Sequence, residues 1–296
     1  MDILLALATA LLLFGQGPLY KIYGKKCVPA GKTDDFLLNV FNFGTGLLAL
    51  IPLSLVGAPF DLNSFLWGIL NGVFFCSMLI FYNKSLKLGK IAFVNFMMAL
   101  AMAIPLLGGM LLFGEEIYPL QWAGLAVLLA ASYLVSYGQK EKDAPKQASD
   151  KKSNAKLWVL SVLGMLANGG LSLFIKYSHY ANPGLNQMQF LMGSYLMSFA
   201  SVGLIAAFTT KGRPLRYIPN KWFVLLGLAL GAVTVMGNMA FTFFSVQARA
   251  SVFYPITGAL PMLLAALISP LLKEKLSKMT LMGLILGTAA IILLNF

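Results

Sequence analysis

Charged residues are scarce in this sequence, where Asp, Glu, Lys and Arg together make up 11% of 296 residues. Soluble domains typically carry about 25% of these residues, and hydrophobic residues here reach 59%. A water-soluble fold of this length cannot bury so many apolar side chains, so lipid must solvate most of the surface. The composition and its long apolar runs therefore predict an all-α membrane protein.

Carboxylates and histidine are also few, and none falls in the middle of an apolar run. All ten Asp and Glu residues lie at the ends of such runs or between them, and the single histidine, His179, lies at a run end. Catalysis and metal binding need such groups to converge, so we predict no enzyme activity, no metal and no cofactor. Exchange of cationic drugs against protons at a buried acid is also disfavoured.

Cysteine is limited to Cys27 and Cys76, which are too few for a disulfide framework. The net charge of +12 does not predict nucleic-acid binding, because the basic residues lie in short connections and are typical of topology signals. The first apolar run, 2–23, lacks a basic leader and continues past Gly17 and Pro18 without a cleavage motif. We therefore expect a membrane span there rather than a signal peptide.

Apolar runs of about 20 residues, the length that crosses a bilayer as a helix, are abundant. Ten transmembrane helices are predicted, at 2–23, 36–57, 64–86, 91–113, 119–138, 156–179, 185–208, 220–245, 250–272 and 278–295. The stretch 139–155 is polar, charged and free of aromatic residues, which is typical of a flexible linker. It divides the chain into two five-helix halves, 1–138 and 156–296.

The two halves resemble each other at a nearly constant spacing. A shift of 159 residues aligns Gly68 with Gly227, Gly72 with Gly231, Glu115 with Glu274, and Lys90 with Arg249. Since each half has an odd number of spans, the second copy must enter the membrane from the opposite side. The halves are therefore predicted to be inverted repeats, as in many alternating-access transporters. We expect the two glutamates to stabilise helix starts. The two cations are expected to be interfacial anchors or, alternatively, to contact an anion.

Basic residues concentrate on one predicted side of the membrane. Of the 22 Lys and Arg residues, all but Lys176 and Arg249 lie on the side that holds the linker. The positive-inside rule then predicts a cytoplasmic linker and both termini outside.

Two stretches carry a family resemblance. Residues 250–294 contain a Pro-containing span, a Glu-Lys turn and a Gly-rich last span, and residues 91–135 are a weaker equivalent. With ten spans in two inverted halves, the chain resembles the drug/metabolite transporter superfamily and its EamA-like families. The resemblance implies a plasma-membrane (bacterial inner-membrane) secondary transporter, a monomer or homodimer. It would move a small polar or amphipathic metabolite by alternating access through a central cavity between the repeats.

Uncharged polar residues within the spans are the candidates for substrate binding. Gln16 and Asn168 lead, because each is followed by glycine at an equivalent position of its half, in FGQGPL and LANGGL. An amide in hydrocarbon needs a partner, so these two side chains either contact substrate or hydrogen-bond to a neighbouring helix. The further candidates are Asn42, Asn71, Tyr195, Asn238 and Tyr254.

Helix-bending residues are candidates for gating. Gly17, Pro18, Pro255 and Pro261 interrupt spans and provide either hinges or static bends, and Tyr82 lies near a predicted cytoplasmic gate. Two other functions remain open at this point. The protein is alternatively a non-transporting scaffold or receptor, or a flippase for a lipid-linked substrate.

Overall fold

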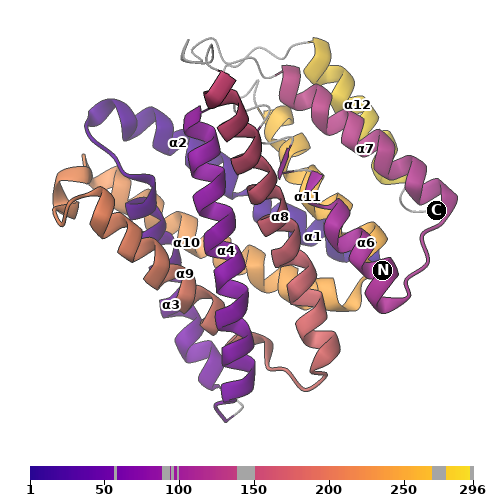
Figure 1. Ribbon diagram of the computed structural model, residues 1–296, viewed down its shortest axis with the longest axis horizontal. Coiled ribbons are helices and arrows are strands. Elements are labelled where there is room, and N and C mark those ends of the chain that lie inside the picture. The colour runs from indigo at the N-terminus through magenta and orange to yellow at the C-terminus, as the bar shows by residue number, and fades with distance from the viewer. Residues whose placement is uncertain are drawn as a thin grey trace. The chain divides into compact units, whose positions relative to one another are not determined.

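A computed structural model describes residues 1–56, 59–88, 94, 97–98, 100–138, 151–268 and 278–293. Throughout these ranges the regular elements are helices (Figure 1). The α-helices are α1 (Asp2–Phe14), α2 (Gln16–Lys26), α3 (Asp35–Leu55), α4 (Leu62–Leu88), α6 (Ala103–Phe113), α7 (Pro119–Gly138), α8 (Lys151–Ala181), α9 (Gln187–Thr209), α10 (Lys221–Gln247), α11 (Ala250–Ile268) and α12 (Lys278–Leu293). Two short 3-10 helices are η1 (Val28–Ala30) and η2 (Pro214–Tyr217).

The prediction of an all-helical protein with several membrane spans is confirmed over these ranges. Six helical stretches are long and apolar enough to cross a membrane, namely Asp2–Ala30, Asp35–Leu55, Leu62–Ser85, Ala155–Ala181, Gln187–Thr209 and Lys221–Gln247. Each of the ten predicted spans contains a helix, with α1 and α2 together forming the first. The beginning of the predicted span 91–113 and the end of 250–272 lie outside the described residues.

Helix α8 begins earlier than the sequence analysis predicted. It starts at Lys151, so the last five residues of the predicted linker are helical, while 139–150 lie outside the described residues. No proline or glycine occurs between Lys151 and Gly164, and the helix therefore extends beyond its apolar part without a breaker.

The first span is divided at Gly15, where α1 ends and α2 begins. Pro18 has no N–H to donate to the carbonyl of Phe14, so one hydrogen bond of a continuous helix is missing at this point. Gly15 keeps helical angles, with φ −54° and ψ −23°. In contrast, Pro255 and Pro261 lie inside α11 without dividing it.

The chain forms two compact units that both draw on the two predicted halves. The first unit comprises Met1–Phe14, Ser77–Phe174 and Phe244–Phe296, and the second comprises Gly15–Cys76 and Ile175–Phe243. The boundaries between units therefore fall inside α4, α8 and α10. These units do not coincide with the two predicted repeats, 1–138 and 156–296, which stay a prediction.

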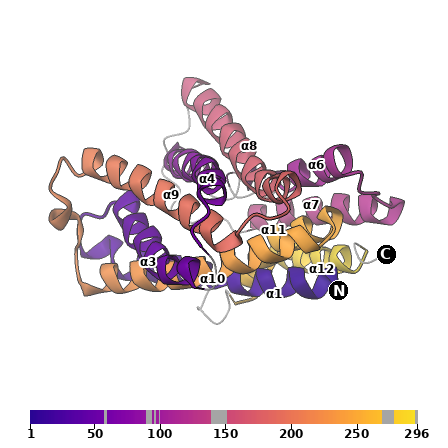
Figure 2. The same ribbon diagram turned by 90° about the horizontal axis from the view of Figure 1, so that it is seen from below.

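In the first unit, helices from opposite halves pack in pairs. Helix α7 lies along α12, and α1 lies along α11 (Figures 1 and 2). Helix α6 meets α8 through two glycines: a side chain at Gly108 would contact Leu173, and one at Gly169 would contact Ile104. Small residues at these positions allow the helices to approach closely.

The second unit is built around the pair α3 and α9. Helix α4 packs on α9, and a Cβ atom at Gly72 would lie 2.6 Å from the Ser194 carbonyl oxygen. Helix α10 packs on α3, where a Cβ atom at Gly231 would lie 2.5 Å from the Asn42 carbonyl oxygen. The glycines that aligned the two halves in sequence are thus positions of close helix contact.

Candidate functional site

Helices α2 and α3 run antiparallel and are joined by two tyrosines. The Tyr23 hydroxyl donates a hydrogen bond to Asp35 Oδ1 (3.2 Å), and the Tyr20 hydroxyl donates to Asn39 Oδ1 (3.4 Å). Tyr23 pairs with Asp35 and Tyr20 pairs with Asn39, so moving one turn toward the start of α2 corresponds to moving one turn toward the end of α3.

One further helical turn in this register places Gln16 at the level of Asn42, because positions three or four apart share a helix face. Asn42 Nδ2 donates to Asn39 Oδ1 (3.2 Å), while Asn42 Oδ1 is buried without a hydrogen-bond partner. Gln16 is half-buried, and no residue in the described ranges hydrogen-bonds to its side chain. Two predicted binding residues therefore lie on facing helices with unused hydrogen-bonding groups.

Three more predicted residues lie in the interior of the same unit. Tyr195 of α9 is fully buried, and its hydroxyl accepts a hydrogen bond from Asn238 Nδ2 of α10 (2.9 Å). Asn71 Nδ2 of α4 donates to Ser194 Oγ (2.9 Å), next to Tyr195 in the chain. The Tyr195 ring makes edge contacts with Phe43, at a centroid distance of 5.6 Å. Hydrogen bonds and rings thus hold Tyr195 in one orientation.

Several buried side-chain oxygens in this unit have no hydrogen-bond partner among the described residues. They belong to α3, α4, α9 and α10, and are Asn42 Oδ1, Asn71 Oδ1, Ser198 Oγ and Thr234 Oγ1. An unsatisfied buried polar group costs about 1–3 kcal/mol. Water or a bound polar ligand removes that cost, so we take these groups together with Gln16 as the candidate site, and call it the polar interior.

The remaining two predicted binding residues lie in the first unit and are already hydrogen-bonded to the backbone. Asn168 Nδ2 donates to the Met98 carbonyl oxygen (3.3 Å), and the Tyr254 hydroxyl donates to the Ser172 carbonyl oxygen (3.1 Å). Asn168 thus makes the hydrogen bond to a neighbouring segment that was its alternative role. Gln16 and Asn168 hold equivalent sequence positions but have different surroundings.

The predicted hinge residues are found at several places. Gly17 and Pro18 follow the division between α1 and α2, and Pro255 and Pro261 lie in α11. Tyr82 lies in the part of α4 that belongs to the first unit, with its backbone nitrogen 3.7 Å from a Cβ atom built at Gly164. Their role as hinges stays a prediction.

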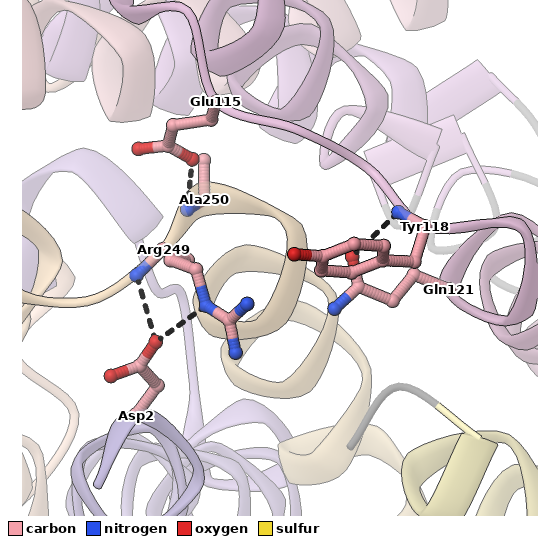
Figure 3. Close-up of polar contacts among 6 residues, drawn as sticks. All are labelled: Asp2, Glu115, Tyr118, Gln121, Arg249 and Ala250. Atoms are coloured by element: carbon pink, nitrogen blue, oxygen red, sulfur yellow. Dashed lines mark hydrogen bonds and ion pairs between the residues drawn. The ribbon is translucent and has the colours of Figure 1, made fainter. Parts of the chain in front are cut away.

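The first turn of α11 is stabilised by two carboxylates from distant parts of the first unit (Figure 3). Asp2 Oδ2 accepts hydrogen bonds from the Arg249 backbone N–H (3.2 Å) and Nε (3.1 Å), and Glu115 Oε2 accepts from the Ala250 N–H (2.6 Å). The N–H groups at the start of a helix have no carbonyl acceptor within the helix, so these carboxylates supply one. Negative charge at a helix N-terminus is also favourable.

This arrangement bears on two expectations from the sequence. Glu115 does stabilise a helix start, but that of α11 rather than that of the last helix of its own half, α7. Arg249 forms an ion pair with Asp2 instead of acting only as an interfacial anchor. Sequence reasoning missed Asp2, because nothing in the local pattern of an N-terminal acid indicates a contact with residue 249. Lys90 and Glu274, the equivalents in the other halves, lie outside the described residues.

The described part of the chain contains no group of three His, Cys, Asp or Glu residues placed to bind a metal ion. Comparison with known families matches residues 2–137 to the EamA-like transporter family. The resemblance predicted from the sequence is therefore confirmed for the first half, and the chain is a multi-pass membrane protein.

A solved crystal structure supports the fold of the chain as a whole. It is 17% identical in sequence, has a TM-score of 0.78, and the alignment covers 99% of this chain and 96% of the other. At this identity the likeness shows the fold alone. No curated protein matches the chain.

Proposed function

We propose that this protein is a secondary transporter that moves a small polar or amphipathic metabolite by alternating access through a central cavity between its repeats. The observation that carries the proposal is the polar interior: buried amide and hydroxyl oxygens without partners among the described residues, in a chain whose first half matches a transporter family. These groups are uncharged, so they suit a substrate that offers hydrogen-bond donors rather than one recognised by ion pairing.

The pairing of helices supports the inverted repeat that alternating access uses. Helix α1 packs on α11, and their equivalents in the other half, α8 and α6, also pack on each other. Likewise, α4 packs on α9 as α10 packs on α3. Three further pairs, α3 with α9, α7 with α12 and α6 with α11, each join a helix to its own equivalent. A two-fold relation between the halves would account for these contacts.

Substrate binding is tested with the purified protein and a metabolite library, using thermal unfolding as the readout. A compound that binds the native state raises its apparent stability. We expect a hit whose shift is lost in Gln16→Leu and in Asn42→Leu, because both variants remove amide groups of the polar interior. A shift that persists in both variants would contradict the site.

Transport itself is tested in proteoliposomes with the compound found by this screen. We expect uptake by the native protein, none by Gln16→Leu, and reduced stability with residual uptake for Asn168→Leu, whose amide is bonded to the Met98 carbonyl. Binding without uptake would favour a receptor or scaffold. Movement of a lipid-linked compound between leaflets would favour a flippase.

A further inference from the structure

At one end of the second unit, two loops from the two halves of the chain are joined. Asn220 Nδ2 donates a hydrogen bond to the Lys26 carbonyl oxygen (2.9 Å), and the Cys27 thiol lies 3.7 Å from Asn220 Oδ1. Asn220 Oδ1 also accepts from the Phe223 N–H (3.2 Å) at the start of α10. One asparagine therefore connects the end of α2 to the beginning of α10, and the two loops form one surface.

This surface carries a set of exposed basic side chains, here called the basic rim. They are Lys25, Lys26, Lys32, Lys211, Arg213, Arg216 and Lys221. In the part of the chain that the structure describes, none of them forms an ion pair. The two acids at the start of α3 are engaged elsewhere: Asp34 Oδ1 accepts from the Leu37 N–H (2.9 Å), and Asp35 accepts from the Tyr23 hydroxyl. The positive charge of the rim therefore has no counter-ion within the described chain.

Apolar side chains are exposed among these charges. Leu215 in η2 is 81% exposed between two arginines, and Val28 in η1 is 51% exposed. The Lys26 ammonium lies over the Trp222 ring, 3.5 Å from its centroid. Exposed apolar residues and Trp beside Lys and Arg are typical of the membrane interface, where apolar groups reach the acyl chains and cations reach the phosphates.

We propose that the basic rim is a binding site for anionic phospholipid headgroups of the adjacent leaflet. Clustered Lys and Arg next to a transmembrane helix attract such headgroups, and arginine binds phosphate oxygens through two N–H groups at once. Leu215 and Val28 anchor the loops in the lipid. Because residues from both halves form the rim, a bound lipid connects them and stabilises the second unit. The proposal does not depend on which compound the protein transports.

The test uses the full chain purified in neutral detergent, with its thermal unfolding measured against added phosphatidylglycerol and, separately, phosphatidylcholine. We compare the native protein with a rim variant, Lys25→Gln/Arg213→Gln/Arg216→Gln. The matched control, Lys84→Gln/Lys156→Gln/Lys278→Gln, loses the same charge at exposed positions of the first unit. Since each interfacial cation contributes about 1 kcal/mol, the rim variant should bind phosphatidylglycerol roughly a hundredfold more weakly.

The expected result is stabilisation by phosphatidylglycerol that is retained in the control and lost in the rim variant, with equal unfolding temperatures of all three proteins in phosphatidylcholine. Leu215→Ser should weaken the phosphatidylglycerol effect without changing charge. Equal loss in both triple variants, or equal stabilisation by the two lipids, would overturn the proposal. Stabilisation by inorganic phosphate to the same extent would also overturn it, because the site would then bind free anions rather than lipid.

Discussion

At the scale of single residues, glycine decides how closely the helices of the second unit approach. The glycines aligned by the repeat are also those whose missing side chains make room for a neighbouring backbone, as at Gly72 beside Ser194 and at Gly231 beside Asn42. Membrane helices lack a hydrophobic force between them, so close packing of this kind supplies much of their association.

Replacing Gly231 with alanine should therefore destabilise the protein. The new Cβ atom would lie 2.5 Å from both the Asn42 carbonyl oxygen and Thr45 Cβ, and overpacking of this kind costs about 1–3 kcal/mol. Gly203→Ala is the matched control, because no atom lies within 4 Å of its Cβ position. Thermal unfolding in detergent should show a lower midpoint for Gly231→Ala only. Equal midpoints for the two variants would mean that α10 moves away from α3 at little cost.

Glu115 provides a second residue-level prediction. Glu115→Ala leaves the Ala250 N–H without its acceptor, and loss of a helix N-terminal partner costs about 0.5–2 kcal/mol. Asp2→Ala should cost less, because the Asp2–Arg249 pair is partly exposed, at 26% and 50% of the two side chains, and such pairs contribute about 0–1 kcal/mol. Thermal unfolding of the two variants should therefore show a larger decrease in midpoint for Glu115→Ala than for Asp2→Ala. A larger loss for Asp2→Ala would reverse this ranking.

At the scale of elements, side chains just outside the helices determine where several of them begin. Asp34 accepts a hydrogen bond from the Leu37 N–H at the start of α3, and Asn186 accepts from the Met188 N–H (3.1 Å) at the start of α9. Asp61 has the same role for α4, because its carboxylate accepts from the Ser64 hydroxyl and N–H. These residues are typical N-caps.

The Asp61 cap predicts a pH dependence. Hydrogen bonds from the Ser64 side chain, then its backbone, lower the pKa of the Asp61 carboxyl below its ordinary value of 3.8. A lowered folded-state pKa means that the contribution to stability is present above about pH 3.8 and is lost as the pH falls through the folded value. The difference in unfolding midpoint between the native protein and Asp61→Ala should therefore shrink below about pH 3.8. A difference that stays constant with pH would exclude a role for the ionised carboxylate.

The elements themselves were largely predictable from the sequence, whereas their contacts were not. Apolar length and the Pro and Gly positions indicated every span, because a helix must satisfy its own backbone within lipid. The linker was predicted to end at residue 155, but α8 already begins at Lys151. A polar extension of a helix such as Lys151–Lys156 carries no apolar pattern that would reveal it. The contact between Asp2 and Arg249 was not predictable because it depends on tertiary packing. The free Gln16 amide and bonded Asn168 amide differ for the same reason.

At the scale of the whole molecule, charge predicts orientation. In the second unit, the basic rim lies where α2 and α9 end, whereas the loop before α9, residues 182–186, contains no Lys or Arg. The positive-inside rule then predicts that the rim faces the cytoplasm.

Cysteine labelling tests this orientation. In a background with Cys27 and Cys76 replaced by serine, we introduce Gly184→Cys or Arg213→Cys, both at exposed loop positions. A membrane-impermeant maleimide added to intact cells should label position 184, and should label position 213 only after permeabilisation. The opposite pattern would invert the predicted topology and place both termini in the cytoplasm.

The pairing of α7 with α12 has a consequence for synthesis. Helix α7 ends at Gly138 and α12 begins at Lys278, so the ribosome adds the intervening chain before the partner exists. At about 5–20 residues per second this takes roughly 7–28 seconds. Throughout that interval, the side of α7 that later contacts α12 must be occupied by lipid, by the insertion machinery or by another nascent helix. The first half of the chain therefore enters the membrane without the partner of α7, and α12 completes this pair only later.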